Sequence, residues 1–192
     1  MVRRSHFLRS LLALAAGGLL SSTLLAADAW PSKPIRLVVP YPPGGSSDII
    51  ARSIGQLISQ ELKQTVVIDN KPGANGNLGA EFVARAPADG YTWLLCDLGA
   101  LAISPSIYTK LSFDPSKALR GAAMLAYSPH MLVVHPSVQA SNLKELVELS
   151  KKQDLNFAVT ASGSAPHLAG VELARITGAK WVYVPYKGGV QS

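Results

Sequence analysis

One short stretch of this sequence carries residue types suited to acyl transfer. In "ASGSAPH", residues 161–167, Ser162 and Ser164 precede His167. A serine becomes a nucleophile when a histidine accepts its proton, so Ser162 or Ser164 with His167 as the base defines a hydrolase hypothesis. The G-x-S-x-G elbow is absent, and residues so close in sequence need not converge in space. The hypothesis requires that Ser164→Ala abolishes any esterase activity.

Loops rich in glycine and serine offer a second kind of chemistry, the binding of an anion. Each of three such loops, "PPGGSSD", "KPGANGNLG" and "ASGSAPH", follows an apolar run. In parallel α/β sheets such loops lead into helix N-termini, whose amides bind anions. Gly44 and Gly45 permit close approach in the first loop, and its serines add hydroxyl donors. A plain turn with a serine helix cap explains the same residues, so both interpretations stay open.

Motifs for nucleotides, metals and other cofactors are missing. Gly73, Gly76 and Gly79 have the wrong spacing for a dinucleotide fingerprint, and no Lys-Ser or Lys-Thr pair follows them as in a P-loop. Cys96 is the single cysteine, and the four histidines show no ligand spacing on one helix. We therefore expect no cofactor, and the loops favour a small acid over a nucleotide.

The first 29 residues read as an export signal. Three arginines stand in the first nine residues, Leu11–Ala27 carries no charge, and Ala27-Asp28-Ala29 is a small-x-small site. We expect cleavage after Ala29, with Ala27 as the next choice, by the Sec or the twin-arginine route. A membrane anchor is the alternative, but the run is shorter than the ~20 apolar residues of a span and contains glycines and serines.

The charge of the remaining chain argues against a nucleic-acid partner. Cleavage after Ala29 removes three arginines and one aspartate, which lowers the formal net charge from +6 to +4. The longest run of basic residues is Lys151-Lys152, so no basic patch is indicated. A small positive balance suits an anionic small molecule, although a surplus of this size is also usual on a soluble surface.

Alternating apolar runs and helix-like segments must position the loops. The runs "IRLVV", "TVVI" and "TWLLC" are continuous, as in strands buried on both faces of a parallel sheet. An apolar stripe at helical spacing predicts a helix between the first two runs, with Ser46 or Ser47 as its cap. The pattern indicates βαβ units and an α/β fold with doubly wound sheets.

A second series of the same kind begins at "MLVVHP", residues 131–136. Asn142 and Glu145 form a capping box that opens a helix, and "LNFAVT" is predicted as the next strand. A helix over "LAGVELARIT" then ends at Gly178.

Two of the predicted strands end alike, in "VPYPPGG" at residues 39–45 and "VPYKGG" at residues 184–189. Coincidence is one explanation, because strand endings with proline and glycine are common. The other is that two loops of like design face each other across a cleft.

These motifs resemble a known family. The runs "WPSKPIRLVVPYPPGGSSDIIAR", "VVIDNKPGANGNLGAEFVARAPADGYT", "SAPHLAGVEL" and "VPYKGG", in this order, are similar to the solute receptors of tripartite tricarboxylate transporters, the Bug family. The resemblance extends from Trp30 to Ser192. It implies a two-domain, type II periplasmic-binding-protein-like fold that closes on a small organic acid. It also implies a monomer in the periplasm that passes its ligand to membrane transporter subunits and is not an enzyme.

The resemblance assigns domains and binding residues. Residues 30–126 correspond to domain 1, and residues 127–192 correspond to the start of domain 2. The ligand carboxylate is held by the loop after the first strand and by loops of the second domain. Asp48 is expected to fix its loop rather than to touch an anionic ligand. The residues that match the family's site are Pro43, Gly44, Gly45, Ser46, Ser47, Asp48, Ala74, Gly76, Ser162, Ser164 and His167.

The sequence departs from the family pattern after the third strand. Where the family usually has Gly-Thr and then Asn-Pro, this chain has Asp97-Leu98 and Ser104-Pro105. Asp97 near the cleft would disfavour a second ligand carboxylate or require a cation. The alternative is that Asp97 caps the next helix.

The resemblance also implies a C-terminally truncated chain, because family members continue well past "VPYKGG". A cut there exposes apolar faces and sheet edges. We therefore expect residues 30–192 alone to be unstable or to aggregate, and to bind ligand weakly. A cooperative thermal unfolding transition together with submicromolar affinity would refute this. A non-functional receptor remnant is the corresponding alternative to a working receptor.

Overall fold

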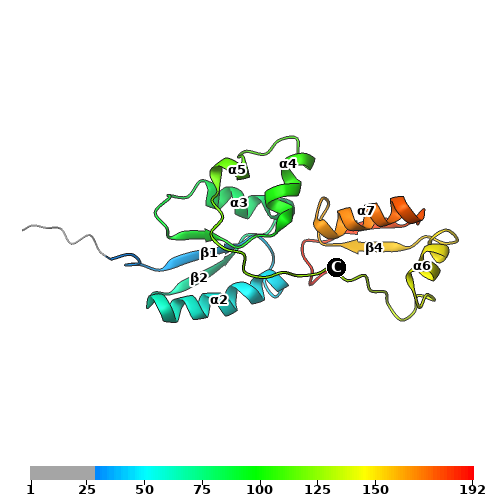
Figure 1. Cartoon of the computed structure of the whole chain (residues 1–192), viewed down its shortest axis with the longest axis horizontal. Helices are drawn as coiled ribbons and strands as arrows, with labels where there is room; N and C mark the ends of the chain where they lie inside the picture. Colours follow the sequence, from blue (N-terminus) through cyan, green and yellow to red (C-terminus); the bar gives the residue numbers. More distant parts are fainter. Residues whose placement is uncertain (1–28) are drawn as a thin grey trace, which may run out of the picture. The chain divides into compact units, whose positions relative to one another are not determined.

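A three-stranded parallel sheet organises the first half of the chain. The computed structural model describes residues 29–192 (Figure 1). Its strands β1 (Ile35–Val39), β2 (Val66–Asn70) and β3 (Thr92–Leu94) run in the order β2-β1-β3. The predicted parallel sheet is confirmed. The most buried strand is the central β1, where Ile35 and Val38 are fully buried.

The predicted export signal and its membrane-anchor alternative fall on residues 1–28, outside the described residues. Within residues 29–192, no helix combines the length and the apolar character needed to cross a bilayer. Both predicted series lie in one unit, Lys33–Ser192.

Helices α2 (Ser46–Leu62) and α3 (Asn77–Ala84) lie on opposite sides of β1 and β2 in Figure 1, as expected for a doubly wound sheet. Glycines allow this packing. A Cβ atom at Gly55 of α2 would lie 3.2 Å from Cδ1 of Ile68, and one at Gly79 of α3 would lie 2.7 Å from Cβ of Pro40. Helix α3 therefore packs directly on Pro40, the first residue after β1.

The predicted cap of α2 is wrong. Gly45 occupies the N-cap position and makes no side-chain capping bond, and Ser46 and Ser47 are the first two helical residues. The side chain that binds a loop amide here belongs to Asp48, whose Oδ2 accepts from the N–H of Gly44 at 2.9 Å. The carboxylate in the first turn thus binds an amide of the loop before the helix, and α2 has no side-chain cap.

Short helical turns complete the first half. They are η1 (Ala74–Gly76) before α3, η2 (Gly99–Ile103) running into α4 (Ser104–Ile107), and α5 (Pro115–Ala118).

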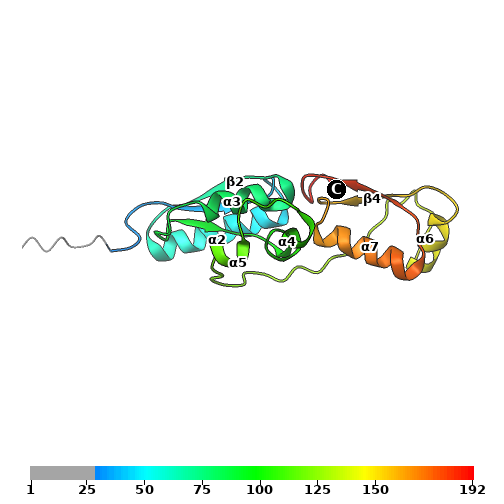
Figure 2. The ribbon, with the colours of Figure 1, turned by 90° about the horizontal axis from the view of Figure 1, so that it is seen from above.

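The second series contains a two-stranded parallel sheet and two helices. Strand β4 (Asn156–Val159) pairs with β5 (Val182–Pro185), and both views place α7 (Ala165–Thr177) alongside β4 (Figures 1 and 2). The rings of Phe157 and Tyr183 lie 5.6 Å apart between their centroids, and α7 meets them through Gly170. The strands predicted within "LNFAVT" and at the second Val-Pro-Tyr motif are confirmed.

The predicted capping box opens α6 (Leu143–Ser150). The N–H of Glu145 donates to Oδ1 of Asn142 at 3.0 Å. The carboxylate of Glu145 returns to the N–H of Ser141 at 2.7 Å and to the Asn142 side chain, rather than to the Asn142 backbone. The C-cap of α7 at Gly178 is also confirmed, with φ of 72°.

Two boundaries of the second series differ from the prediction. Helix α7 begins at Ala165 instead of Leu168, because Ser164 caps it by accepting from the N–H of His167.

Residues 131–136 form no strand. They pair with no described strand, and Met131 is 84% exposed. A β-strand needs a hydrogen-bonded neighbour, which apolar composition alone cannot supply.

Replacing Gly79 by alanine tests the close approach of α3 to Pro40. The new Cβ would lie within 3.1 Å of atoms of Pro40 and Lys71, so a buried backbone must shift. We expect the free energy of unfolding to fall by about 1–3 kcal/mol in urea titrations. Gly121→Ala is the matched control, because nothing lies within 4 Å of its Cβ position. Equal stability of the two variants would contradict the packing described here.

Candidate ligand-binding site

A buried carboxylate fixes the loop that follows β1. Asp48 is 3% exposed, and its Oδ2 accepts from the N–H of Gly44 and from Nε of Arg52, each at 2.9 Å. Its Oδ1 accepts from Nδ2 of Asn70 at 3.0 Å, and the same Nδ2 donates to the carbonyl of Tyr41. Asp48 thus ties both sides of the loop to the end of β2. As expected from the sequence, this carboxylate positions the loop.

The hydrogen bond from Arg52 lowers the pKa of Asp48 from 3.8 to about 2, against the opposing effect of burial. The bonds from the Gly44 amide and the Asn70 side chain act in the same direction. Asp48 is therefore ionised at neutral pH and holds its donors as a charged acceptor.

A hollow of about 210 Å³ lies at the carboxyl ends of the strands. Loops of both series line it. From the first series come Pro40, Tyr41, Gly73, Ala74, Asn75, Gly76 and Tyr108. From the second come Thr160, Ala161, Ser162, Pro185, Tyr186 and Lys187. We call this the strand-end hollow.

The two Val-Pro-Tyr motifs meet at this hollow. Pro40 and Tyr41 follow β1, and the second motif ends β5 and continues into Tyr186. The sequence hypothesis that these loops face a common cleft agrees with their shared lining of the strand-end hollow.

The turn Ala74–Gly76 contributes strained backbone to the lining. Ala74, Asn75 and Gly76 have φ values of 48°, 55° and 87°. Left-handed backbone is costly for the two non-glycine residues, so the surrounding structure must enforce it. A Cβ at Gly76 would also lie 3.2 Å from the hydroxyl oxygen of Tyr41, so the third position suits glycine.

Direct contacts join the loops around the strand-end hollow. Nδ2 of the buried Asn75 donates to the carbonyl of Gly163 at 3.1 Å. A Cβ at Gly188 would lie 2.9 Å from Cδ of Pro42, so the second Gly-Gly loop packs directly on the first. Sequence reasoning did not single out Asn75, and its positive φ is not readable from composition.

Asp97 does not line the strand-end hollow. Its Oδ1 accepts from the N–H of Gly99 at 2.8 Å at the start of η2, whose N-cap is Leu98. This geometry agrees with the helix-start interpretation of Asp97.

Burial raises the pKa of the Tyr41 hydroxyl, and the nearby Asp97 charge raises it further. Burial, followed by Asp97, raises the pKa of the Cys96 thiol to about 11. Both groups are therefore neutral at physiological pH.

The serine–histidine group lacks the geometry of a nucleophile and its base. Oγ of Ser164 donates to the carbonyl of Ala161 at 2.8 Å and accepts from the N–H of His167. Nδ1 of His167 accepts from the N–H of Gly163 at 3.0 Å, and the ring packs on Tyr183. Both side chains thus form hydrogen bonds to the backbone of the turn before α7. This geometry does not support the hydrolase hypothesis.

The structure brings together only part of the predicted site. Ala74, Gly76 and Ser162 line the strand-end hollow. Ser164 and His167 lie behind it in the α7 turn. The other predicted residues form the β1–α2 loop and the start of α2, outside the lining: Pro43, Gly44, Gly45, Ser46, Ser47 and Asp48.

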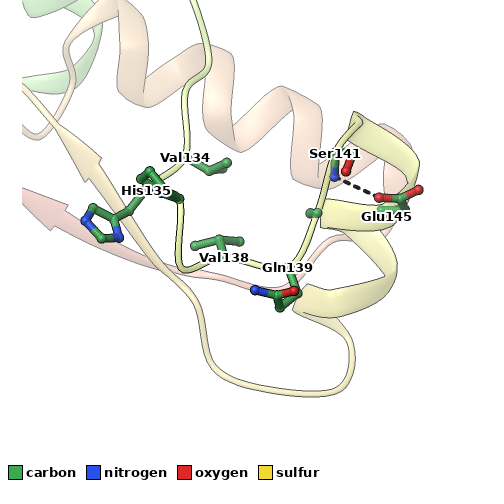
Figure 3. Close-up of a pocket in the computed structure, with 8 residues that line it drawn as sticks. Val134, His135, Val138, Gln139, Ser141 and Glu145 are labelled. Carbon is green, nitrogen blue, oxygen red and sulfur yellow. Dashed lines mark hydrogen bonds between the residues drawn. The ribbon is translucent and has the colours of Figure 1, made fainter.

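A larger hollow, of about 470 Å³, lies in the second series beside the start of α6. Figure 3 shows His135 and the bonded pair of Ser141 and Glu145 at opposite ends of it. Its lining includes the Glu145 carboxylate, which repels an anion. The described residues contain no group of three His, Cys, Asp or Glu side chains that could hold a metal ion.

Comparison with known proteins identifies the family. The family model described as "Tripartite tricarboxylate transporter family receptor" matches residues 50–192. The chain belongs to this receptor family. The match includes all of β4, α7 and β5 and most of α2.

Individual relatives agree with this assignment. Protein BugT of Bordetella pertussis is 35% identical over 167 residues, which cover 85% of this chain and 51% of BugT. Among solved structures, the periplasmic binding protein BugD matches with a TM-score of 0.70 and 34% identity, covering 84% of this chain and 55% of BugD. The fold is therefore that of a periplasmic solute-binding protein, represented by a partial domain structure.

Two further solved structures contain ligands. MatC from Rhodopseudomonas palustris, with bound malate, has a TM-score of 0.76 and 30% identity over 83% of this chain and 55% of MatC. Rpa4515 of R. palustris, with adipate, has a TM-score of 0.73 and 31% identity over 84% of this chain and 55% of its own. The receptor chain described here spans about half the length of the curated relatives it matches.

Replacing Asp48 by asparagine tests the loop network through its pH dependence. Because the folded-state pKa is lowered, the stabilisation by Asp48 is present above pH 3.8 and is lost as the pH falls towards 2. We expect Asp48→Asn to lower the free energy of unfolding by about 1–3 kcal/mol at pH 7. The difference from wild type should shrink in urea titrations between pH 4 and pH 2.

The matched control is Glu172→Gln, which alters an exposed pair with Arg175. This variant should change stability much less at every pH. A wild-type difference for Asp48→Asn that stays constant down to pH 2 would show that the carboxylate charge does not hold the loop.

Proposed function

We propose that this chain is a solute receptor that binds a small organic carboxylate in the strand-end hollow and performs no chemistry on it. The composition of the lining supports this most directly. It contains five hydroxyl-bearing residues and one lysine, and no aspartate or glutamate of the described chain takes part. Such a lining favours an anion, because hydrogen bonds from hydroxyls and an ammonium group stabilise a carboxylate.

The size of the hollow supports a small ligand. Sites for drug-sized molecules have volumes of roughly 300–1,000 Å³, whereas the strand-end hollow has about 210 Å³. The ligands of two structural relatives, malate and adipate, are small dicarboxylates. The proposed ligand class is therefore the one that these relatives bind.

The β1–α2 loop belongs to the proposed site as well. Gly44 has φ of 83° and is exposed, and the adjoining amides stand at the N-terminus of the 17-residue helix α2. Pro43, Gly44, Gly45, Ser46 and Ser47 are proposed to bind the ligand from this loop, which adjoins the lining residues Pro40 and Tyr41. Asp48 would keep its positioning role, and Ser164 and His167 would support the loop that carries Ser162.

The setting proposed for this receptor is the bacterial periplasm. The N-terminal residues read as an export signal, and the structural relative BugD is a periplasmic binding protein. We propose that the chain acts as a monomer and passes its ligand to membrane transporter subunits. Residues 30–126 and 127–192 are its proposed domains.

Blocking the strand-end hollow tests the location of the site. Ser162 is exposed and lines the hollow, so Ser162→Trp should occupy it without disturbing the core. Titrations of the isotope-labelled chain with malate and adipate, followed by NMR, should show affinity reduced by about 10-fold or more, in line with the loss of one or two charge-assisted hydrogen bonds.

Gln139→Trp is the matched control, because it places the same side chain in the larger hollow near Glu145. This variant should bind both acids as the wild type does. Loss of binding in Gln139→Trp with retention in Ser162→Trp would move the site to the larger hollow.

A further inference from the structure

The two Val-Pro-Tyr loops that meet at the strand-end hollow differ in charge at one place. After Tyr41 the first loop continues with Pro42 and Pro43, and after Tyr186 the second continues with Lys187 before its Gly-Gly pair. We propose that Lys187 is a specificity-determining residue that binds a second carboxylate of the ligand, so that dicarboxylates are preferred over monocarboxylates. This inference rests on the proposed function.

The backbone around Lys187 is held in place. The N–H of Tyr186 donates to the carbonyl of Val159 at 2.8 Å, which continues the β4–β5 ladder by one bond. The N–H of Lys187 donates to Oε1 of Gln191 at 3.3 Å. The next residue, Gly188, is buried against the ring of Pro42. Lys187 therefore stands at a fixed point where the two loops touch.

The ammonium group of Lys187 is available to a ligand. The residue is exposed, and no carboxylate of the described chain forms an ion pair with it. The described basic residues that do form ion pairs include Lys33, Arg52 and Lys151. Lys187 is also the single residue with a full charge in the lining of the strand-end hollow.

The remaining polar residues of the lining are neutral. Ser162, Thr160, Tyr108 and Tyr186 offer hydroxyls, which can hold one carboxylate by hydrogen bonds, whereas the Tyr41 hydroxyl is buried. A second carboxylate at the other end of the ligand needs compensation for its lost hydration, and a cation supplies more of it than a hydroxyl does. Asp97 is not a lining residue: its Oδ1 accepts from the Gly99 amide, and its charge acts on the buried Tyr41 hydroxyl.

The experiment compares acids of equal chain length that differ by one carboxylate. The 192-residue chain is titrated with adipate and hexanoate, and with succinate and butyrate, up to 20 mM at pH 7, with binding followed by NMR. The variants are Lys187→Gln, which removes the charge, and Lys187→Arg, which keeps it. Lys144→Gln removes an exposed lysine of α6 that is absent from the lining.

We expect the wild type to prefer each dicarboxylate. Lys187→Gln should weaken dicarboxylate binding by about 10-fold, the effect of one charge-assisted hydrogen bond, and change monocarboxylate binding by less than about 2-fold. Lys187→Arg should retain the preference, and Lys144→Gln should match the wild type.

Equal loss of both ligand types in Lys187→Gln, or loss of neither, would overturn the role of Lys187 while leaving the receptor function intact. A wild type that binds both types equally would do the same. A wild type that binds none of the four acids would overturn the proposed function, and this inference with it.

Discussion

The ionised carboxylate of Asp48 is the constraint on which the strand-end loops depend. It is buried at the first turn of α2 and accepts hydrogen bonds from a loop amide, from Arg52 and from Asn70 at the end of β2. Asn70 in turn holds the carbonyl of Tyr41. A neutral side chain could not satisfy these donors equally well, because hydrogen bonds to a charged acceptor are the stronger ones. One charge therefore fixes the path of the chain from β1 into α2.

Packing of glycines supplies the second constraint. Gly79 lets α3 approach Pro40, Gly76 leaves room for the Tyr41 hydroxyl, and Gly188 allows the second loop to pack on Pro42. Each contact brings backbone or ring atoms closer than a side chain would allow. The lining of the strand-end hollow is built from loops positioned by these contacts and by the Asn75–Gly163 hydrogen bond. The result is a small, hydroxyl-rich hollow with one cation, which suits an acid of a few carbon atoms.

The sequence predicted the regular elements well, because their signals are local. Continuous apolar runs indicated β1, β2 and β3, and the Asn142–Glu145 pair and Gly178 marked helix ends that the structure confirms. Features that depend on distant partners were missed. Residues 131–136 have strand composition but pair with no described strand, and Gly45, without a side-chain capping bond, occupies the N-cap position expected for Ser46 or Ser47.

The site residues also divide into those with a local sequence signal and those that depend on distant partners. The resemblance pointed to loops of both series, and three of its residues, Ala74, Gly76 and Ser162, line the strand-end hollow. Tyr41, Asn75 and Lys187 were not singled out, because their place in the lining follows from how two loops far apart in sequence pack together. The repeated Val-Pro-Tyr motif was the available signal, since Tyr41 and Tyr186 belong to it and Lys187 follows directly.

A crystal structure of the chain grown with saturating adipate tests the central claim most directly. The account predicts adipate in the strand-end hollow, with one carboxylate on neutral donors that include Ser162 and the other within hydrogen-bonding distance of Nζ of Lys187. Adipate bound beside Glu145 in the larger hollow, with the strand-end hollow empty, would contradict it.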